Sequence, residues 1–406
     1  MTTFLQLHLL TAYPPACLNR DDLNRPKTAV MGGVPRLRVS SQSLKRAWRT
    51  SDTFREALTG HTGIRSKELG RHICDALLSG VALADLLKPN APEAKSDGKI
   101  DEKNAKEWAW MIAAEYVDKK GKGDNEDGDD APEGDDAEAK KKGKKKGGKT
   151  NVSKETLKSE QVVFYSKVEI EALSKLVTAL RASGKAPTAE QLKAIKVEDS
   201  GDTADLALFG RMLATSPKFN VEAACQVAHA ITVHRAAVED DFFTAVDDLN
   251  TREEDAGSAH MGEQGFGAGL FYLYVCVNCD QLREQLRDEQ LGDELAGKTI
   301  RALIDSAATV APTGKQNSFA SRAWAYYALA EKGSRQPRAL SLAFVKPVRE
   351  GDMLSDAAAA LTGMRDNLDK VYYQGKSVES RSINAVTGEG DFEALKQWAV
   401  DFRSAS

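Results

Sequence analysis

Residues 18–49 read LNRDDLNRPKTAVMGGVPRLRVSSQSLKRAWR, which contains a polar loop, the glycine pair Gly32 and Gly33, a short strand and a helix. In the strand, Leu37 and Val39 alternate with polar residues, the period-two pattern of a strand with one buried face. The polar positions of this alternation are Arg36, Arg38 and Ser40. The stretch therefore predicts a half-buried strand that leads directly into a helix.

The helix opens on Ser41, Gln42 and Ser43, residue types that suit a helix N-terminus. Three apolar residues follow at i, i+3, i+4 spacing and can pack on a sheet: Leu44, Ala47 and Trp48. The remaining faces carry the cations Lys45, Arg46 and Arg49. Because a helix N-terminus offers unpaired N–H groups and the positive end of a dipole, we expect this stretch to bind a run of phosphates. The alternative is an ordinary amphipathic helix whose charges are solvated.

Composition limits the classes of protein that the chain can belong to. Its 406 residues allow two domains or one elaborated domain. A net charge of −4 argues against non-specific duplex binding, so any basic nucleic-acid footprint has to be local. No apolar run approaches the roughly 18 residues of a membrane span, and the N-terminus shows no secretion signal. We expect a cytoplasmic protein with no membrane contact.

The five cysteines do not form a metal-binding pattern. Only Cys276 and Cys279 have a metal-like spacing, and no second pair completes a tetrahedral site. We expect reduced, mostly buried thiols. The sequence predicts neither a metal site nor a cofactor.

The first half of the chain predicts one strand and a helical insertion. Residues 4–10 alternate as a strand whose polar face includes His8, expected at the surface or on an edge strand. Residues 66–117 and 161–181 show helical periodicity. Residues 118–150 hold an acidic block followed by a lysine block, with hardly an apolar residue, so we expect a disordered insertion.

The second half predicts a mixture of strands and helices. Expected strands are 205–209, 269–278 and 339–348, and expected helices are 280–287, 295–307, 356–371 and 392–402. Residues 242–267 are consistent with a projecting hairpin with a polar tip at 250–255, whereas the periodicity of 222–234 decides nothing. The order of elements fits a split β-α-β arrangement, an α+β fold of the ferredoxin-like type.

Two further motifs invite a chemical interpretation. Gly314 and Lys315 lack the glycine spacing and the following Ser or Thr of a phosphate-binding loop, which argues against a nucleotide triphosphatase. Lys315, Gln316 and Asn317 could instead contact backbone phosphates, or form a plain turn. The adjacent carboxylates Asp21–Asp22 and Asp247–Asp248 are of a type that binds Mg²⁺ in nucleases, although neighbouring side chains on one element diverge and no histidine lies nearby in sequence.

Several segments resemble one known family in the same order along the chain. They are CLNRDD (17–22), RVSSQSLKRA (38–47), GRMLATS (210–216), HAITVH (229–234) and FTAVDDL…GSAHMG (243–262). They are similar to the CasC family, the backbone subunit of the type I-E CRISPR surveillance complex Cascade. The long charged insertion departs from the family pattern and leaves the bounds of the finger domain open.

The resemblance implies an RRM-like palm that carries helical fingers and a β-hairpin thumb. The implied parts are palm at 1–58, 205–235 and 267–406, fingers at 59–204 with the insertion 118–150, and thumb at 236–266. It implies a non-catalytic subunit that binds CRISPR RNA, packs head to tail into a helical filament with other Cascade subunits, and meets target DNA through guide pairing.

The implied RNA-binding residues combine the basic stretch with positions taken from the family motifs. Met212 would lie against guide bases, and Thr244 and Met261 would sit on the thumb that displaces one base. The full set is Asn19, Arg20, Lys27, Arg38, Ser40, Gln42, Lys45, Arg46, Arg49, Met212, Thr244, Met261, Lys315, Gln316 and Asn317. Two alternatives stay open: a metal-dependent ribonuclease that uses the aspartate pairs, and a free RRM-like RNA-binding monomer.

Overall fold

The computed structural model describes residues 2–88, 90–116, 157–159, 161–196, 201–213, 216–245, 260–286, 293–349 and 351–401. The chain forms two compact units. Unit 1 comprises Met1–Gly63, Ser200–Gly210 and Val221–Ser406, and unit 2 comprises Ile64–Asp199 and Arg211–Asn220. The expected disordered insertion at 118–150 and the hairpin tip at 250–255 lie outside the described residues.

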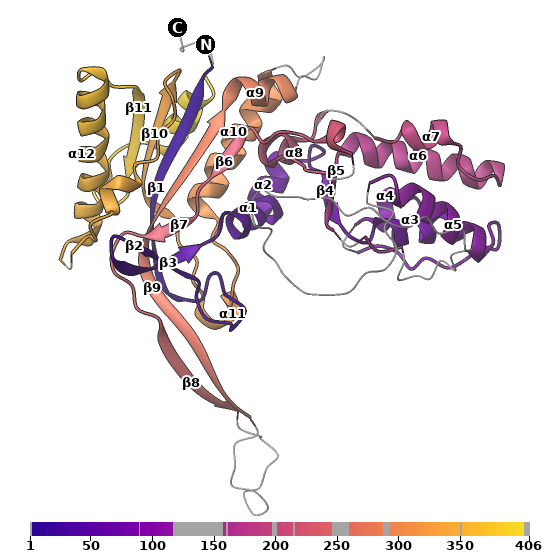
Figure 1. The fold of residues 1–406 in the computed structure, drawn as a ribbon, viewed down its shortest axis with the longest axis horizontal. Coiled ribbons are helices and arrows are strands. Elements are labelled where there is room, and N and C mark those ends of the chain that lie inside the picture. Colours follow the sequence, from indigo (N-terminus) through magenta and orange to yellow (C-terminus); the bar gives the residue numbers. More distant parts are fainter. Residues whose placement is uncertain are drawn as a thin grey trace, which may run out of the picture. The chain divides into compact units, whose positions relative to one another are not determined.

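Unit 1 is built on an antiparallel sheet in the order β11-β10-β1-β9-β7-β3-β2, with β6 and β8 also paired to β9 (Figure 1). The strands are β1 (Phe4–Ala16), β2 (Thr28–Met31), β3 (Val34–Val39), β6 (Cys225–Val227), β7 (Ala230–Thr232), β8 (Glu239–Ala245), β9 (His260–Asn278), β10 (Ala325–Gly333) and β11 (Glu379–Asn384). The long pairing of β1 with β9 joins residues about 270 positions apart, such as Leu5 and Val277. Strands from the beginning, the middle and the end of the chain thus belong to one sheet.

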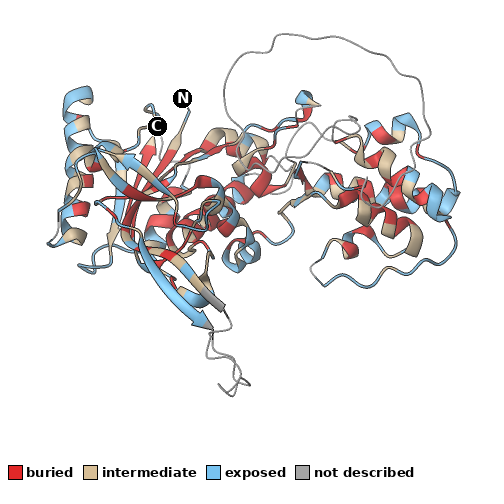
Figure 2. Cartoon of the chain, turned by 60° about the horizontal axis from the view of Figure 1, so that its bottom comes forward, coloured by how far each residue is buried: buried red, intermediate tan, exposed pale blue. Residues whose placement is uncertain are grey.

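Helices cover both faces of this sheet. One face carries Leu5, Leu7 and Leu9 against α1 (Ser41–Thr50), α2 (Asp52–Ala57), α8 (Ala204–Phe209), α9 (Cys279–Gln285), α10 (Asp293–Thr309) and α13 (Phe392–Ala399). The other face buries Leu10, Tyr272 and Leu329 against the 3₁₀ turn Ser341–Phe344 and α12 (Met353–Tyr373). Figure 2 shows the buried residues concentrated along the sheet between these layers. The mixed α+β class with an antiparallel sheet is confirmed.

The expected hairpin is present, and it carries Thr244 and Met261. β8 and the first part of β9 extend beyond the sheet (Figure 1). Thr244 pairs with Met261 across the two strands. Residues 222–234, which the periodicity left open, contain the short strands β6 and β7.

Two residues on the polar faces of strands, one in β1 and one in β3, are buried, contrary to expectation. His8 is fully buried because its ring bonds Tyr272 Oη at 2.9 Å and Glu331 Oε2 at 3.2 Å. Arg36 is fully buried as well, since its guanidinium donates to the carbonyls of Thr232 (3.0 Å) and Phe344 (2.8 Å). Period-two alternation marked two faces correctly, but the second face is covered by the turn Ser341–Phe344 and α12.

Two strands expected from sequence are wrong. Residues 204–209 form helix α8, since Leu208 stacks one turn after Ala204 on the buried side. Residues 341–344 form a 3₁₀ turn. The carbonyls of Phe344, its last residue, and of Val345, which follows it, accept hydrogen bonds from the Arg36 guanidinium. The strand that the sheet uses instead is β10, whose AYYALAEKG sequence carries alanines at buried positions and gives a weak strand signal.

Unit 2 is mainly helical, as predicted for 66–117 and 161–181. Its helices are α3 (Leu69–Ser79), α4 (Leu83–Leu86), α5 (Glu102–Ala113), α6 (Lys167–Ser183) and α7 (Ala189–Lys193), with the 3₁₀ turn Pro217–Phe219. A small sheet of β4 (Ile64–Ser66) and β5 (Val163–Tyr165) joins them. Their apolar faces form one buried cluster that includes Ile73, Trp108 and Leu173. No helix among the residues described for the two units is long and apolar enough to cross a membrane.

Candidate nucleic-acid interface

The N-cap of helix α1 lies one residue earlier than expected. The polar loop before β2 is hydrogen-bonded to this N-cap residue. Ser40 is the N-cap: its Oγ accepts from the Ser43 N–H at 3.3 Å. The Ser40 N–H in turn donates to Asn19 Oδ1 at 2.8 Å. Asn19 therefore links the loop to the helix start, and Gln42, next in the first turn, is exposed. The N-terminal N–H groups of α1 are presented at a fixed place beside the loop.

Backbone bonds bring Lys27 and Arg38 together at this same edge. The Lys27 N–H donates to the Asn19 carbonyl at 2.9 Å, and the Arg38 N–H donates to the Lys27 carbonyl at 2.8 Å. Arg38 Nη1 then donates to His229 Nδ1 at 2.8 Å. The imidazole accepts this bond in its neutral form, because a protonated ring has no acceptor nitrogen.

His229, which was not among the residues predicted from the sequence, lies in a positive electrostatic environment. Partial burial lowers the pKa of His229, and the charges of Arg38, Lys27 and Lys45 lower it further. Arg38 contacts the ring directly, and the charges of Lys27 and Lys45 act on it from two other segments. Such an environment disfavours further positive charge and favours a bound anion. His229 belongs to the HAITVH motif, so the sequence held a signal for it, although its role was not recognised.

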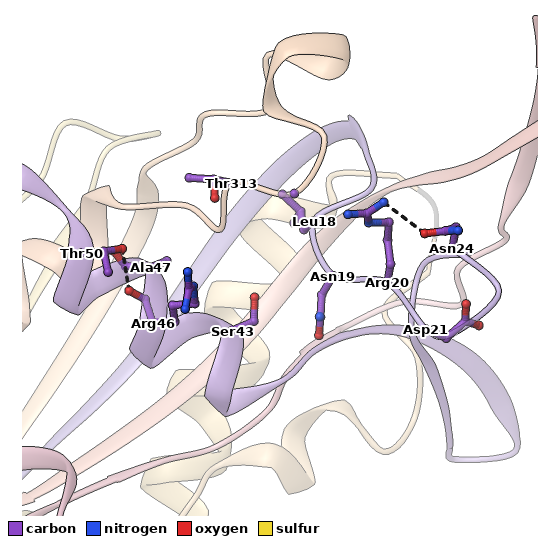
Figure 3. A pocket seen from close by; sticks show the side chains of 11 residues that line it. Leu18, Asn19, Arg20, Asp21, Asn24, Ser43, Arg46, Ala47, Thr50 and Thr313 are labelled. Atoms are coloured by element: carbon purple, nitrogen blue, oxygen red, sulfur yellow. Dashed lines mark hydrogen bonds between the residues drawn. The ribbon is translucent and has the colours of Figure 1, made fainter. Parts of the chain in front are cut away.

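A polar hollow of about 350 Å³ lies along one side of α1, from Ser43 to Thr50 (Figure 3). Figure 3 shows Ser43, Arg46 and Thr50 of the helix on one side and the side chains of the 19–24 loop on the other. Within that loop, Arg20 Nη1 donates to Asn24 Oδ1 at 3.2 Å. The lining residues are Leu18, Asn19, Arg20, Asp21, Asn24, Ser43, Arg46, Ala47, Thr50, Thr313 and Gly314.

Thr313 and Gly314 line one side of the hollow. A Cβ on Gly314 would lie 2.4 Å from the Leu18 carbonyl oxygen, so only glycine permits this approach. Lys315 follows with φ of +52°, and Gln316 and Asn317 begin the short helix α11 (Gln316–Phe319). Burial raises the pKa of the Cys17 thiol, against the opposing charges of Arg20 and Lys315.

Arg49, predicted to contact phosphate, forms an ion pair with Asp205 within the chain. Its Nε and Nη2 donate to Asp205 Oδ2 at 2.9 and 2.7 Å, and the two side chains are 12% and 1% exposed. The other Asp205 oxygen accepts from the Gly63 N–H at 2.8 Å. Burial raises the pKa of Asp205, while Arg49 and the Gly63 N–H oppose that shift. The geometry of Arg49 is that of a residue that anchors α1.

The remaining expected residues lie elsewhere in the chain. Thr244 is exposed on the β8–β9 hairpin of unit 1. Met212 belongs to unit 2, where its side chain is 83% exposed. The structure thus gathers the phosphate-type residues in unit 1 and places the methionine in the other unit.

Of the aspartate pairs, the structure describes only Asp21 and Asp22. Asp21 Oδ1 accepts from the N–H groups of Leu23 (3.0 Å) and Arg25 (2.9 Å), a side-chain cap of the loop. Asp247 and Asp248 lie outside the described residues. Within the described ranges, no three His, Cys, Asp or Glu side chains are grouped as metal ligands, and the five cysteines are buried and form no disulfide.

Residues 5–404 match the family described as CT1975-like protein, which is nearly the whole chain. The chain belongs to the CT1975-like family. This match confirms the resemblance to the CasC family of type I-E complexes. No curated protein matches the chain.

Solved structures agree with this membership of the CT1975-like family. A chain of a "CRISPR RNA-guided surveillance complex, pre-nicking" is 27% identical, with a TM-score of 0.71 over 98% of this chain and 99% of that one. A chain of a "CRISPR RNA-guided surveillance complex" is 21% identical, with a TM-score of 0.64 over the same shares, and shows the same fold. The similarity in fold covers both units of this chain.

Proposed function

We propose that this chain is the guide-RNA-binding backbone subunit of a type I-E Cascade surveillance complex. In this role it holds CRISPR RNA by its phosphates, assembles with other Cascade subunits and leaves the guide bases free to pair with target DNA. Family membership over residues 5–404 supports the assignment to the complex. It is a binding role without chemistry, since sequence reading is delegated to base pairing.

The observation that carries the proposal is the cluster of Lys27, Arg38 and His229, in which the Arg38 N–H donates to the Lys27 carbonyl and Arg38 Nη1 donates to His229 Nδ1. The charge of Lys45 also acts on His229. This cluster, the N-terminus of α1 and the hollow beside it are joined through the hydrogen bonds of Asn19. Single-stranded RNA is held in this manner, through phosphates on a basic surface. The proposed phosphate contacts are Asn19, Arg20, Lys27, Arg38, Ser40, Gln42, Lys45, Arg46, Lys315, Gln316 and Asn317, with Arg49 anchoring the helix.

Unit 1 corresponds in this proposal to an RRM-like palm. Counted along the chain, β1, β7, β9 and β10 stand in the sheet order 4-1-3-2, with α1 and α10 as the crossover helices, which is the ferredoxin-like arrangement. Unit 2 corresponds to the fingers. Its bounds differ from 59–204, because Arg211–Asn220 packs with unit 2 and divides the palm segment expected at 205–235. The β8–β9 hairpin corresponds to the thumb.

The thumb and Met212 complete the proposed role. The thumb, with Thr244 and Met261, reaches the next copy and displaces one base, while Met212 lies against the neighbouring bases. The contact between copies is head to tail, so it does not close and produces a helical filament. The guide is then presented in short kinked segments.

The test is to purify the chain with its co-expressed partners and to analyse the particle. We expect co-purified RNA and, by negative-stain microscopy, elongated particles with several copies of the chain. Particles without RNA, or solitary globules with RNA, contradict the backbone role, and the latter favours a free RNA-binding monomer. Incubation with paired RNA and Mg²⁺ is the second arm, in which cleavage abolished by Asp21→Ala favours the ribonuclease.

A further inference from the structure

Met212 is a long apolar side chain held in solvent between two anchored residues. It is 83% exposed, whereas its neighbours Arg211 and Leu213 are only 6% and 4% exposed. A flexible methionine at such a place would ordinarily bury itself as core filling. Hydrogen bonds fix the backbone on both sides of Met212 and hold its side chain in this exposed position.

The anchor before Met212 is the buried guanidinium of Arg211. Its Nη1 donates to Glu169 Oε2 at 2.6 Å and to the Phe164 carbonyl at 3.1 Å, while Nε and Nη2 donate to the Phe219 carbonyl at 3.1 and 3.0 Å. Glu169 is itself fixed, because it closes the capping box of α6 with Ser166. Only the planar fork of an arginine can reach these acceptors together.

The anchor after Met212 is the Leu213 backbone. The Leu213 N–H donates to Asn220 Oδ1 at 2.6 Å, and the Leu213 side chain packs in the buried cluster of unit 2. Phe219, whose carbonyl receives the Arg211 fork, belongs to the same cluster, and its ring lies 4.8 Å from Lys196 Nζ and 4.5 Å from Lys218 Nζ. Both ends of the 211–220 loop are thus tied to unit 2.

We propose that Arg211 and Asn220 are positioning residues that hold Met212 against the bases of the bound guide. This inference rests on the proposed function, since Met212 contacts bases only if the chain binds a guide. The two residues act on guide geometry and not on guide retention, because the phosphate contacts proposed above belong to unit 1. Their loss should change how bases are presented while RNA stays bound.

The test uses the full complex with its co-purified guide, probed by acylation of ribose 2′-hydroxyls along the RNA. Met212→Ala, Arg211→Lys and Asn220→Ala should raise reactivity at the same nucleotides and leave the RNA yield unchanged. Loss of one hydrogen bond corresponds to about a fivefold shift between the held and released conformations. Asn220→Asp retains the acceptor oxygen for the Leu213 N–H and should give the wild-type profile.

The outcomes separate this inference from the proposed function. If the wild-type protein carries no RNA, the proposed function fails. If RNA is bound but Arg211→Lys and Asn220→Ala both give the wild-type profile, the inference is overturned, as it is if Met212→Ala has no effect. Should Arg211→Lys not fold, Asn220→Ala decides alone, because Asn220 is exposed and its truncation leaves the buried ion pair intact.

Discussion

Lys45 and Arg38 are the side chains through which the proposed grip on phosphates is best measured. They come from different elements, and the positive charge of each lowers the pKa of His229. The Asn19 hydrogen bonds use neither side chain, so they stay in place when both are removed. Replacing both by alanine should weaken RNA binding for every guide sequence and lower the salt slope of binding by about 0.7 for each phosphate that is no longer neutralised. Binding measured between low and moderate salt provides the slope, with exposed Arg55→Ala on α2 as a control for the loss of a surface cation elsewhere. An unchanged slope would remove these residues from the interface.

His8 is a single side chain that should make the stability of unit 1 depend on pH. The buried ring of His8 is neutral at neutral pH, and its Nε2–H donates to the Glu331 carboxylate, which can only accept. Nδ1 therefore accepts from the Tyr272 hydroxyl, which itself accepts from the Leu340 N–H. Burial lowers the pKa of His8 below 6.5 despite the opposing Glu331 carboxylate, and Arg338 and Arg365 lower it further.

The sign of the effect follows from this lowered pKa. Above 6.5 neither state binds a proton at His8, but below it the unfolded chain does and the folded chain does not. The free energy of unfolding should therefore fall between pH 7 and pH 5, by up to about 1.4 kcal/mol per pH unit from this group. Denaturant titrations of wild type and His8→Gln measure it, and the variant should show the smaller loss. Equal losses in the two proteins would mean that His8 is not the titrating group.

At this scale the sequence predicts side-chain faces better than side-chain environments. The alternation in β1 and β3 correctly separated Leu5 and Leu37 from His8 and Arg36. It could not show that the second face is covered, because the covering turn and α12 follow more than 300 residues later. For the same reason Arg49 looked available for phosphate, since its partner Asp205 is 156 residues away.

The turn between β2 and β3 shows how one element depends on two glycines with different surroundings. Gly32 and Gly33 have φ of +62° and +79°, the left-handed pair of a two-residue hairpin turn. A Cβ on Gly32 would lie 1.7 Å from the Val345 carbonyl oxygen, whereas a Cβ on Gly33 would meet nothing within 4 Å. The glycine pair was visible in the sequence, but β2 was not predicted.

Alanine at each glycine should therefore have unequal costs. Gly33→Ala should lose about 1 kcal/mol of stability from backbone strain alone. Gly32→Ala carries the same strain and also drives the turn away from Val345, so its loss should be larger by about 1–3 kcal/mol, as in an overpacked core. Denaturant midpoints of the two variants measure the difference. Equal losses would show that the turn does not pack on the 345 segment.

Elements with strong periodicity or punctuation were predictable, and elements defined by distant partners were not. α6 carries an apolar stripe with Leu173, Leu176 and Leu180, and it lies where the sequence placed it. β10 and β11 were missed, because alanine-rich and polar strands become recognisable only when β1 pairs with β10 and β10 with β11. The motif at 210–216 pointed to Met212 through family resemblance, while its buried neighbour Arg211 drew notice only as an adjacent cation.

At the scale of the whole molecule, the proposed head-to-tail contact means that the length of the bound RNA determines the number of copies in the assembly. A heterologous contact that does not close has no preferred copy number of its own, so the array ends where the guide ends. Complexes formed on guides of increasing length should therefore grow in steps of one whole chain, with plateaus between the steps. Native mass spectrometry of the purified complexes resolves such steps. A copy number that stays constant for all guide lengths would indicate a closed ring or a fixed oligomer, and a copy number of one would leave an RNA-binding monomer.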